Sequence, residues 1–136
     1  ARMGGRLVSA WPMVPDALRV LDTRLPQIPL FVERARGIAM GVGDQPGLSI
    51  TPDPPQVNMM HVRLDCDIAT AEAARDAAAE ATGVWLGNRF WHFEHDPVPA
   101  LELCVGERAF QADIMRIVDA IRAMGAYVTA AQSTSG

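Results

Sequence analysis

The amino-acid sequence predicts an α+β fold, a two-layer sandwich in which a mostly antiparallel sheet of three to four strands packs against helices. Two observations lead to this prediction. Apolar residues recur at spacings of three and four in several segments, which is typical of amphipathic helices. The segments follow in the order helix, helix, short strand, strand, helix, strand, strand, helix, so the strands can pair with each other on one side of the helices.

The N-terminal third predicts two amphipathic helices, over residues 14–25 and 28–40. Pro26 breaks the pattern between them, and Pro29 suits the first turn of the second helix because a residue there needs no N–H partner. Gly41, Gly43 and the Pro46-Gly47 pair are expected to end the second helix.

The next segments predict two extended pieces, residues 48–51 and 57–64, with the proline-rich residues 52–55 as an exposed connector. Side chains alternate across a strand, so the second piece has two distinct faces. Its core face is expected to carry Asn58, Met60, Val62 and Leu64.

The C-terminal half begins with an alanine-rich helix over residues 67–82 that ends at Gly83. An aromatic-rich strand over residues 84–94 and a strand over 100–105 are expected to form an antiparallel hairpin. A last helix is predicted over residues 110–124, ended by Gly125, with a frayed polar tail at 132–136.

Composition excludes several classes of function. With 136 residues, 49% of them hydrophobic, the chain can bury one core without a disulfide or a metal. Acidic residues outnumber basic ones 16 to 12 and no basic run occurs, so nucleic acid is not an expected partner. No stretch of about eighteen residues stays apolar, so no membrane span is expected.

All twelve basic residues are Arg, and the chain has no Lys. These residues therefore supply no side-chain amine to form a Schiff base or to act as a lysine base. The chain opens with Ala1 and has no signal segment, and we expect it to be the interior of a longer cytoplasmic protein. Cys66 and Cys104 lack metal or redox spacing and are expected to be buried thiols.

The histidines do not make a convincing metal site. On a strand His92 and Glu94 share one face while His95 points to the other, so we interpret this segment as the polar end of a hairpin. His61 lies in the middle of a strand and is interpreted as a hydrogen-bonded residue at a sheet face or an interface. No metal ligands and no catalytic nucleophile are predicted.

Short motifs give a resemblance to a known family. Met3-Gly4-Gly5-Arg6 precedes the two helices, and Val57-Asn58-Met59-Met60 follows a short strand. This order resembles the C-terminal small domain of the threonine aldolase and aromatic amino-acid β-eliminating lyase family, which are fold-type I enzymes dependent on pyridoxal phosphate. The resemblance implies that Arg6 matches a cofactor-binding Arg and Asn58 a strand Asn, while the cofactor lysine would precede Ala1.

The resemblance also implies a departure at the substrate. The family's last strand carries Arg-x-Val-Thr-His, whose Arg holds the substrate carboxylate, but this chain has Glu102-Leu103-Cys104-Val105-Gly106. At about 4 Å and an effective dielectric near 20, attraction of the substrate carboxylate by an Arg, or its repulsion by a Glu, is on the order of 4 kcal/mol. Glu102 facing the cleft would need a partner such as Arg89 or Arg6, or a cationic substrate group. A register shift of one residue would instead make Glu102 a solvated surface residue.

We therefore expect residues 1–136 to form one C-terminal small domain, with helices at 1–47 that join a missing large domain and an α+β sandwich at 48–136. The parent would be an oligomeric lyase that cleaves the Cα–Cβ bond of an amino acid or carries out β-elimination. Arg6 is expected to bind the cofactor, and Glu102, Arg89 and Asn58 to bind substrate. This chain alone would bind no pyridoxal phosphate covalently and would be inert. The alternative is a free-standing ligand-binding or dimerisation module.

Overall fold

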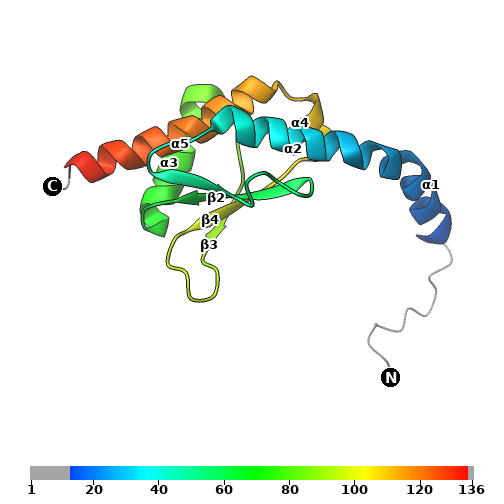
Figure 1. Ribbon diagram of the computed structural model, residues 1–136, viewed down its shortest axis with the longest axis horizontal. Coiled ribbons are helices and arrows are strands. Elements are labelled where there is room, and N and C mark those ends of the chain that lie inside the picture. Colours follow the sequence, from blue (N-terminus) through cyan, green and yellow to red (C-terminus); the bar gives the residue numbers. More distant parts are fainter. Residues whose placement is uncertain (1–12, 135–136) are drawn as a thin grey trace.

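The computed structural model describes residues 13–134 (Figure 1). Its helices and strands, in chain order, are α1 (Val14–Arg24), the 3-10 helix η2 (Leu25–Gln27), α2 (Ile28–Val42), β1 (Leu48–Thr51), β2 (Met59–Leu64), α3 (Ile68–Thr82), β3 (Phe90–Trp91), β4 (Ala100–Cys104), α4 (Glu107–Gln111) and α5 (Ile114–Thr134).

The strands form one antiparallel sheet in the order β1-β2-β4-β3. Leu64 of β2 pairs with Leu48 of β1, and Met60 pairs with Leu103 of β4. The long helices lie together on one side of this sheet (Figure 1). The predicted α+β sandwich with an antiparallel sheet is thus confirmed.

The core lies between the sheet and the helices α2, α3 and α5. Met60, Val62 and Leu64 are buried there, as the alternation along β2 predicts. Asn58 was expected on the same face, but it lies one residue before β2 and is half-buried. Helix α3 contributes a face of buried alanines, so it can pack closely against α5. Each fully buried large apolar side chain stabilises the fold by roughly 1.5–3 kcal/mol.

The opposite face of the sheet carries polar and aromatic residues, and we call it the open face. It is formed by Met59, His61, Arg63, Trp91, Glu102 and Cys104. Arg63 pairs with Asp96 from the loop before β4, which ties that loop to the sheet. No helix of residues 13–134 is long and apolar enough to cross a membrane.

The predicted break between the two N-terminal helices at Pro26 is confirmed. Residues 25–27 form one 3-10 turn between α1 and α2, and α2 ends at Val42 before Gly43, whose φ of 62° favours glycine. Helix α2 buries one face in the core, whereas α1 has no buried residue. A line of apolar side chains therefore stays 43–55% exposed along this segment, namely Val14, Leu18, Leu21, Leu25 and Ile28, which we call the apolar stripe.

The aromatic strand predicted over residues 84–94 is much shorter in the structure. Only Phe90–Trp91 pairs with β4, so the predicted antiparallel hairpin exists but is brief. A Cβ on Gly87 would lie 2.8 Å from Leu101 Cδ1, which indicates how closely the unpaired segment crosses β4. The Trp85 ring instead lies under the Arg75 guanidinium, 4.5 Å from the ring centroid.

The last helix also differs from its prediction. It begins at Ile114 after the short helix α4, and it continues through Gly125 to Thr134. Gly125 is buried inside α5, where an added Cβ would lie 2.5 Å from Leu48 Cδ2. This glycine is therefore a packing residue that lets α5 approach β1, and the expectation that it ends the helix is wrong. The 52–55 connector is exposed as predicted, except for the buried Pro55.

Candidate functional site

A cleft of about 490 Å³ separates the start of the long helical segment from one end of the sheet. We call it the Arg24 cleft. Its lining residues come from α1, η2 and α2 on one side, and on the other from the residue before β2, the turn after β4 and the start of α4: Arg19, Thr23, Arg24, Gln27, Ile28, Phe31, Asn58, Gly106 and Glu107.

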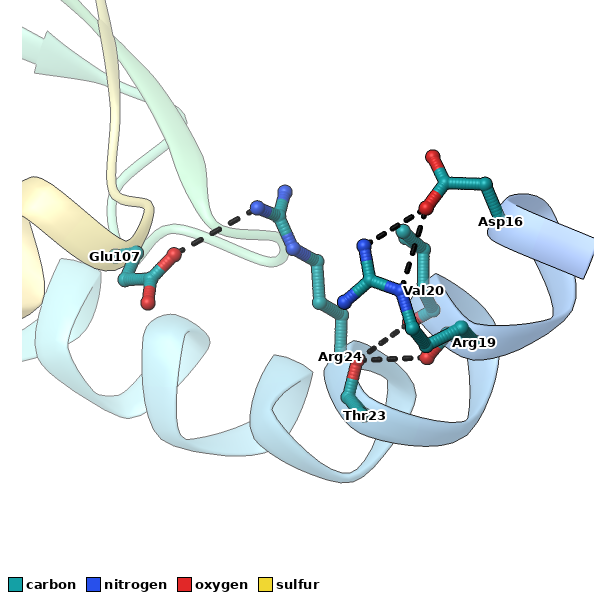
Figure 2. Close-up of polar contacts among 6 residues, drawn as sticks. All are labelled: Asp16, Arg19, Val20, Thr23, Arg24 and Glu107. Carbon is teal, nitrogen blue, oxygen red and sulfur yellow. Dashed lines mark hydrogen bonds and ion pairs between the residues drawn. The ribbon is translucent and has the colours of Figure 1, made fainter. Parts of the chain in front are cut away.

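The helical wall of the cleft follows from residue spacing. Arg19, Thr23 and Gln27 are four residues apart, so they lie in one row along the helix. The Thr23 hydroxyl donates to the Arg19 carbonyl at 2.7 Å, and the Gln27 amide donates to the Thr23 carbonyl at 2.9 Å. Arg19 itself donates to Asp16 Oδ1 at 2.7 Å (Figure 2). These contacts hold the row against its own helix.

The sheet wall is fixed by backbone pairing at the end of β4. The Asn58 side-chain amide donates to the Val105 carbonyl at 3.0 Å, and the Val105 N–H donates to the Asn58 carbonyl at 2.7 Å. Helix α4 starts immediately after Gly106, which brings the Glu107 carboxylate into the cleft.

Helix α4 is anchored on α2 through Phe110. The Phe110 ring packs edge-on against Phe31 with 5.6 Å between centroids, and the Arg34 guanidinium lies 5.4 Å from the Phe110 centroid. Arg34 also donates to the Ala109 carbonyl at 3.0 Å. The side of the cleft that carries Glu107 is thus held by the core of the domain.

One ion pair crosses the cleft. Arg24 Nη2 lies 3.6 Å from Glu107 Oε2, and both side chains are 65% exposed (Figure 2). This separation is longer than a hydrogen bond, so the guanidinium is attracted to Glu107 without being fully occupied by it. Figure 2 shows the Arg24 and Arg19 side chains on the same side of the helix. The arrangement can bind an anion.

The structure does not bring the predicted substrate residues together. Asn58 lines the Arg24 cleft, whereas Glu102 is exposed on the open face, directly opposite His61 of β2. Arg89 is exposed just before β3, and it makes no ion pair with Glu102 within residues 13–134. Arg6 lies outside the described residues.

The cysteines differ from the prediction of two buried thiols. Cys104 is exposed on the open face, where its thiol donates to Glu102 Oε1 at 3.3 Å. Partial desolvation, followed by the hydrogen bond to Glu102 and the charge of Glu102, raises the pKa of this thiol. Cys66 is half-buried, and burial together with Asp67 and Asp65 raises its pKa to about 11. Neither thiol is an activated nucleophile at neutral pH.

The histidines take structural positions. His61 packs edge-on against Phe93 and Trp91, at centroid distances of 5.0 and 5.8 Å. His95 lies 3.6 Å from Glu94, and both are on the solvent side of the loop before β4. Within the part of the chain that the structure describes, no three His, Cys, Asp or Glu residues are placed to hold a metal ion.

Sequence reasoning missed the two arginines of the cleft. For Arg19 the available signal was the row at Arg19, Thr23 and Gln27, on the side of the helix opposite to the apolar stripe, whereas Arg24 lies outside this row. Such a polar row is ordinarily a solvated helix face. It becomes one wall of a cleft only because the connection from Asn58 into β2 and the turn from β4 into α4 end beside it.

No protein-family model matches the sequence, and no curated protein matches it either. Solved structures do resemble the fold. One is assigned as an L-allo-threonine aldolase from Listeria monocytogenes, with a TM-score of 0.76 and 23% identity over 93% of this chain. Another, from Exiguobacterium sp. 255-15, is assigned as an aromatic amino acid β-eliminating lyase/threonine aldolase, with a TM-score of 0.74 and 23% identity over 93% of this chain.

In both cases the match covers 35% of the solved chain, so this chain spans about a third of the length of these relatives. At this level of identity the likeness establishes the fold. The fold is the one that the sequence resemblance implied.

Proposed function

We propose that this chain is the small domain of a pyridoxal-phosphate-dependent lyase of the threonine aldolase and β-eliminating type. The whole enzyme would cleave the Cα–Cβ bond of an amino acid or carry out β-elimination, and this domain would form one wall of its substrate cleft. The observation that carries the proposal is the agreement between the sequence motifs and the fold. The short motifs around Arg6 and Asn58 resemble this family, and the fold matches structures assigned to it over 93% of the chain.

The residues of this chain do not fit the cofactor by themselves. Covalent attachment of pyridoxal phosphate requires a lysine amine, and none of the 136 residues is Lys. Among residues 13–134, no helix begins after a glycine-rich turn that could hold a phosphate. The anchoring lysine and most of the phosphate site would therefore belong to a large domain, with Arg6 as this chain's contribution.

The apolar stripe supports a partner domain. Its five large apolar side chains run along α1, through η2 and onto the start of α2, and the three on α1 belong to a helix with no buried residue. Exposed apolar patches of this kind mark interaction sites. We assign this stripe to contact with the large domain. The complete enzyme would be a cytoplasmic homo-oligomer acting on an amino acid.

The site residues take the following roles in this proposal. Asn58 fixes the ends of β2 and β4 through Val105 and so positions the wall of the cleft. Glu102 would take the place of the carboxylate-binding Arg of the family, and Arg89, which comes just before β3, would be the candidate guanidinium partner, although the two make no ion pair within residues 13–134. The carboxylate at Glu102 favours a substrate with a cationic group there over a simple β-hydroxy amino acid.

The test is expression of the complete reading frame that contains this chain, followed by assay with pyridoxal phosphate. We expect either aldehyde release from a β-hydroxy amino acid or elimination from an aromatic amino acid, with L-allo-threonine as the simple reference substrate that Glu102 is expected to disfavour. A reading frame that begins at Ala1, or a longer product that binds no pyridoxal phosphate, would contradict the proposal and favour the free-standing module.

A further inference from the structure

We propose that the Arg24 cleft binds a small organic oxyanion, a carboxylate or a phosphate ester, independently of the pyridoxal phosphate site. The proposal goes beyond the lyase assignment and does not depend on it. It rests on a cleft that contains two guanidinium groups and one carboxylate, with amide and hydroxyl groups beside them.

The charge that favours an anion in this cleft is that of Arg24. Arg19 and Arg24 contribute two positive charges, Glu107 contributes one negative charge, and Asp16, which is paired with Arg19 beside the cleft, contributes another. Arg19 is already bound to Asp16 at 2.7 Å, so Arg24 is the principal cation. Its separation of 3.6 Å from Glu107 leaves hydrogen-bonding capacity on the guanidinium. An incoming oxyanion can use that planar donor group in a two-point contact.

The rest of the lining fits an organic anion. Phe31 and Ile28 provide apolar surface at the same cleft, which suits the carbon part of a ligand. The Asn58 amide N–H₂ is committed to the Val105 carbonyl, so its oxygen remains an acceptor for a ligand hydroxyl or ammonium. A volume of about 490 Å³ lies within the range of small-molecule sites.

Glu107 gives the cleft a distinctive property. Its carboxylate competes with a bound anion for Arg24, and it also repels that anion. Removal of the Glu107 charge should therefore strengthen anion binding at Arg24. If the Arg24–Glu107 pair had only a structural role, removing this charge would not strengthen binding. An exposed ion pair of this kind corresponds to a few tenths to about 1 kcal/mol, which converts to roughly a twofold to fivefold change in affinity.

The test is titration of the 136-residue chain with succinate and, separately, with inorganic phosphate at low ionic strength, followed by NMR of the Asn58 and Gln27 side-chain amides. We expect saturable binding with a millimolar Kd. Arg24→Gln should weaken it at least tenfold because a hydrogen-bonded charge is lost. Glu107→Gln should tighten it about threefold. Arg108→Gln is the matched control for Arg24→Gln, because it removes a positive charge from the residue of α4 that follows Glu107. It should change the Kd less than twofold.

Binding of succinate alone would assign a carboxylate ligand, and binding of phosphate alone a phosphate ester. No saturable shift with either probe would overturn the proposal. Equal weakening by Arg24→Gln and Arg108→Gln would also overturn it, because binding would then reflect only the general charge of the surface. All three variants alter exposed side chains, and far-UV circular dichroism is the control for folding of each one. The lyase assay uses a different protein and reagent, so its failure is distinguishable from failure here.

Discussion

Replacing Gly125 with Ala tests how closely α5 packs on the sheet. The new Cβ would lie 2.5 Å from Leu48 Cδ2 and 3.3 Å from the Pro46 carbonyl oxygen. The first distance is more than 1 Å shorter than the optimum for two carbon atoms. Because Leu48 is buried and the second contact is backbone, relief requires a shift of α5 or β1. Overpacking of this kind costs about 1–3 kcal/mol.

Replacing Gly125 with Ala also improves helix propensity by about 1 kcal/mol, and this gain offsets part of the overpacking cost. Gly37→Ala in α2 provides the matched control, since its Cβ would lie 3.1 Å from only the flexible end of Ile114. Gly41 is intermediate, with a Cβ 2.9 Å from Val118 Cγ2, a branched side chain with little freedom. We expect Gly37→Ala to be neutral or stabilising and Gly125→Ala to be about 2 kcal/mol less stable than it.

Urea unfolding of the three variants, followed by far-UV circular dichroism, measures these differences at unchanged m-value. The predicted order of stability is Gly37→Ala, then Gly41→Ala, then Gly125→Ala. A Gly125→Ala variant as stable as Gly37→Ala would refute the reasoning, because α5 would then not approach β1 as closely as described.

Three further predictions follow from the surface and the thiols. We expect the isolated chain to self-associate through the apolar stripe, and Leu18→Glu with Leu21→Glu should abolish this association in light scattering because the centre of the stripe is removed. A chain that is already monomeric at high concentration would argue against a covered stripe. Glu102→Arg in the complete enzyme should raise kcat/KM for a β-hydroxy amino acid by tenfold or more, and unchanged substrate preference with unchanged stability would show that Glu102 does not face the substrate. Because the pKa of Cys66 is raised to about 11, only about a thousandth of this thiol should be thiolate at pH 8. Alkylation of Cys66 in the folded chain should therefore be slow at pH 8 and should become faster as the pH approaches 11. Rapid alkylation at pH 8 would contradict the burial and the acidic neighbours that raise the pKa.

Local physics explains which parts of the fold were predictable. The core face of β2 follows from strict alternation, and the break at Pro26 follows from the missing N–H and fixed φ of proline. The boundary at Gly83 follows from its left-handed conformation. Each of these depends on residues close in the sequence, so the sequence contains the relevant signal.

The errors depend on contacts that are distant in the sequence. Gly125 resembles a helix end locally, but its role is set by Leu48, 77 positions away in the chain. The aromatic segment before β4 has strong strand propensity, yet only two of its residues find a pairing partner. Exposure of Cys104 follows from its place on the open face, which depends on the register of β4 against β2.

The candidate site was predictable only in part. Asn58 was identified through a motif, and it does line the Arg24 cleft. Arg24 was not identified, because its partner Glu107 lies on an element that comes much later in the chain. Glu102 and Arg89 were expected to act together, and the structure places Glu102 opposite His61 without an ion pair to Arg89 within residues 13–134.

The most direct test of the central claim is borohydride reduction of the complete gene product with bound pyridoxal phosphate, followed by peptide mapping. The account predicts one stable adduct on a lysine outside these 136 residues, since no Lys occurs within them. The 136-residue chain treated in the same way should give no adduct except at its N-terminal amine. A complete product that forms no lysine adduct, or a stable adduct on a side chain within these residues, would contradict the assignment of this chain as the small domain of such a lyase.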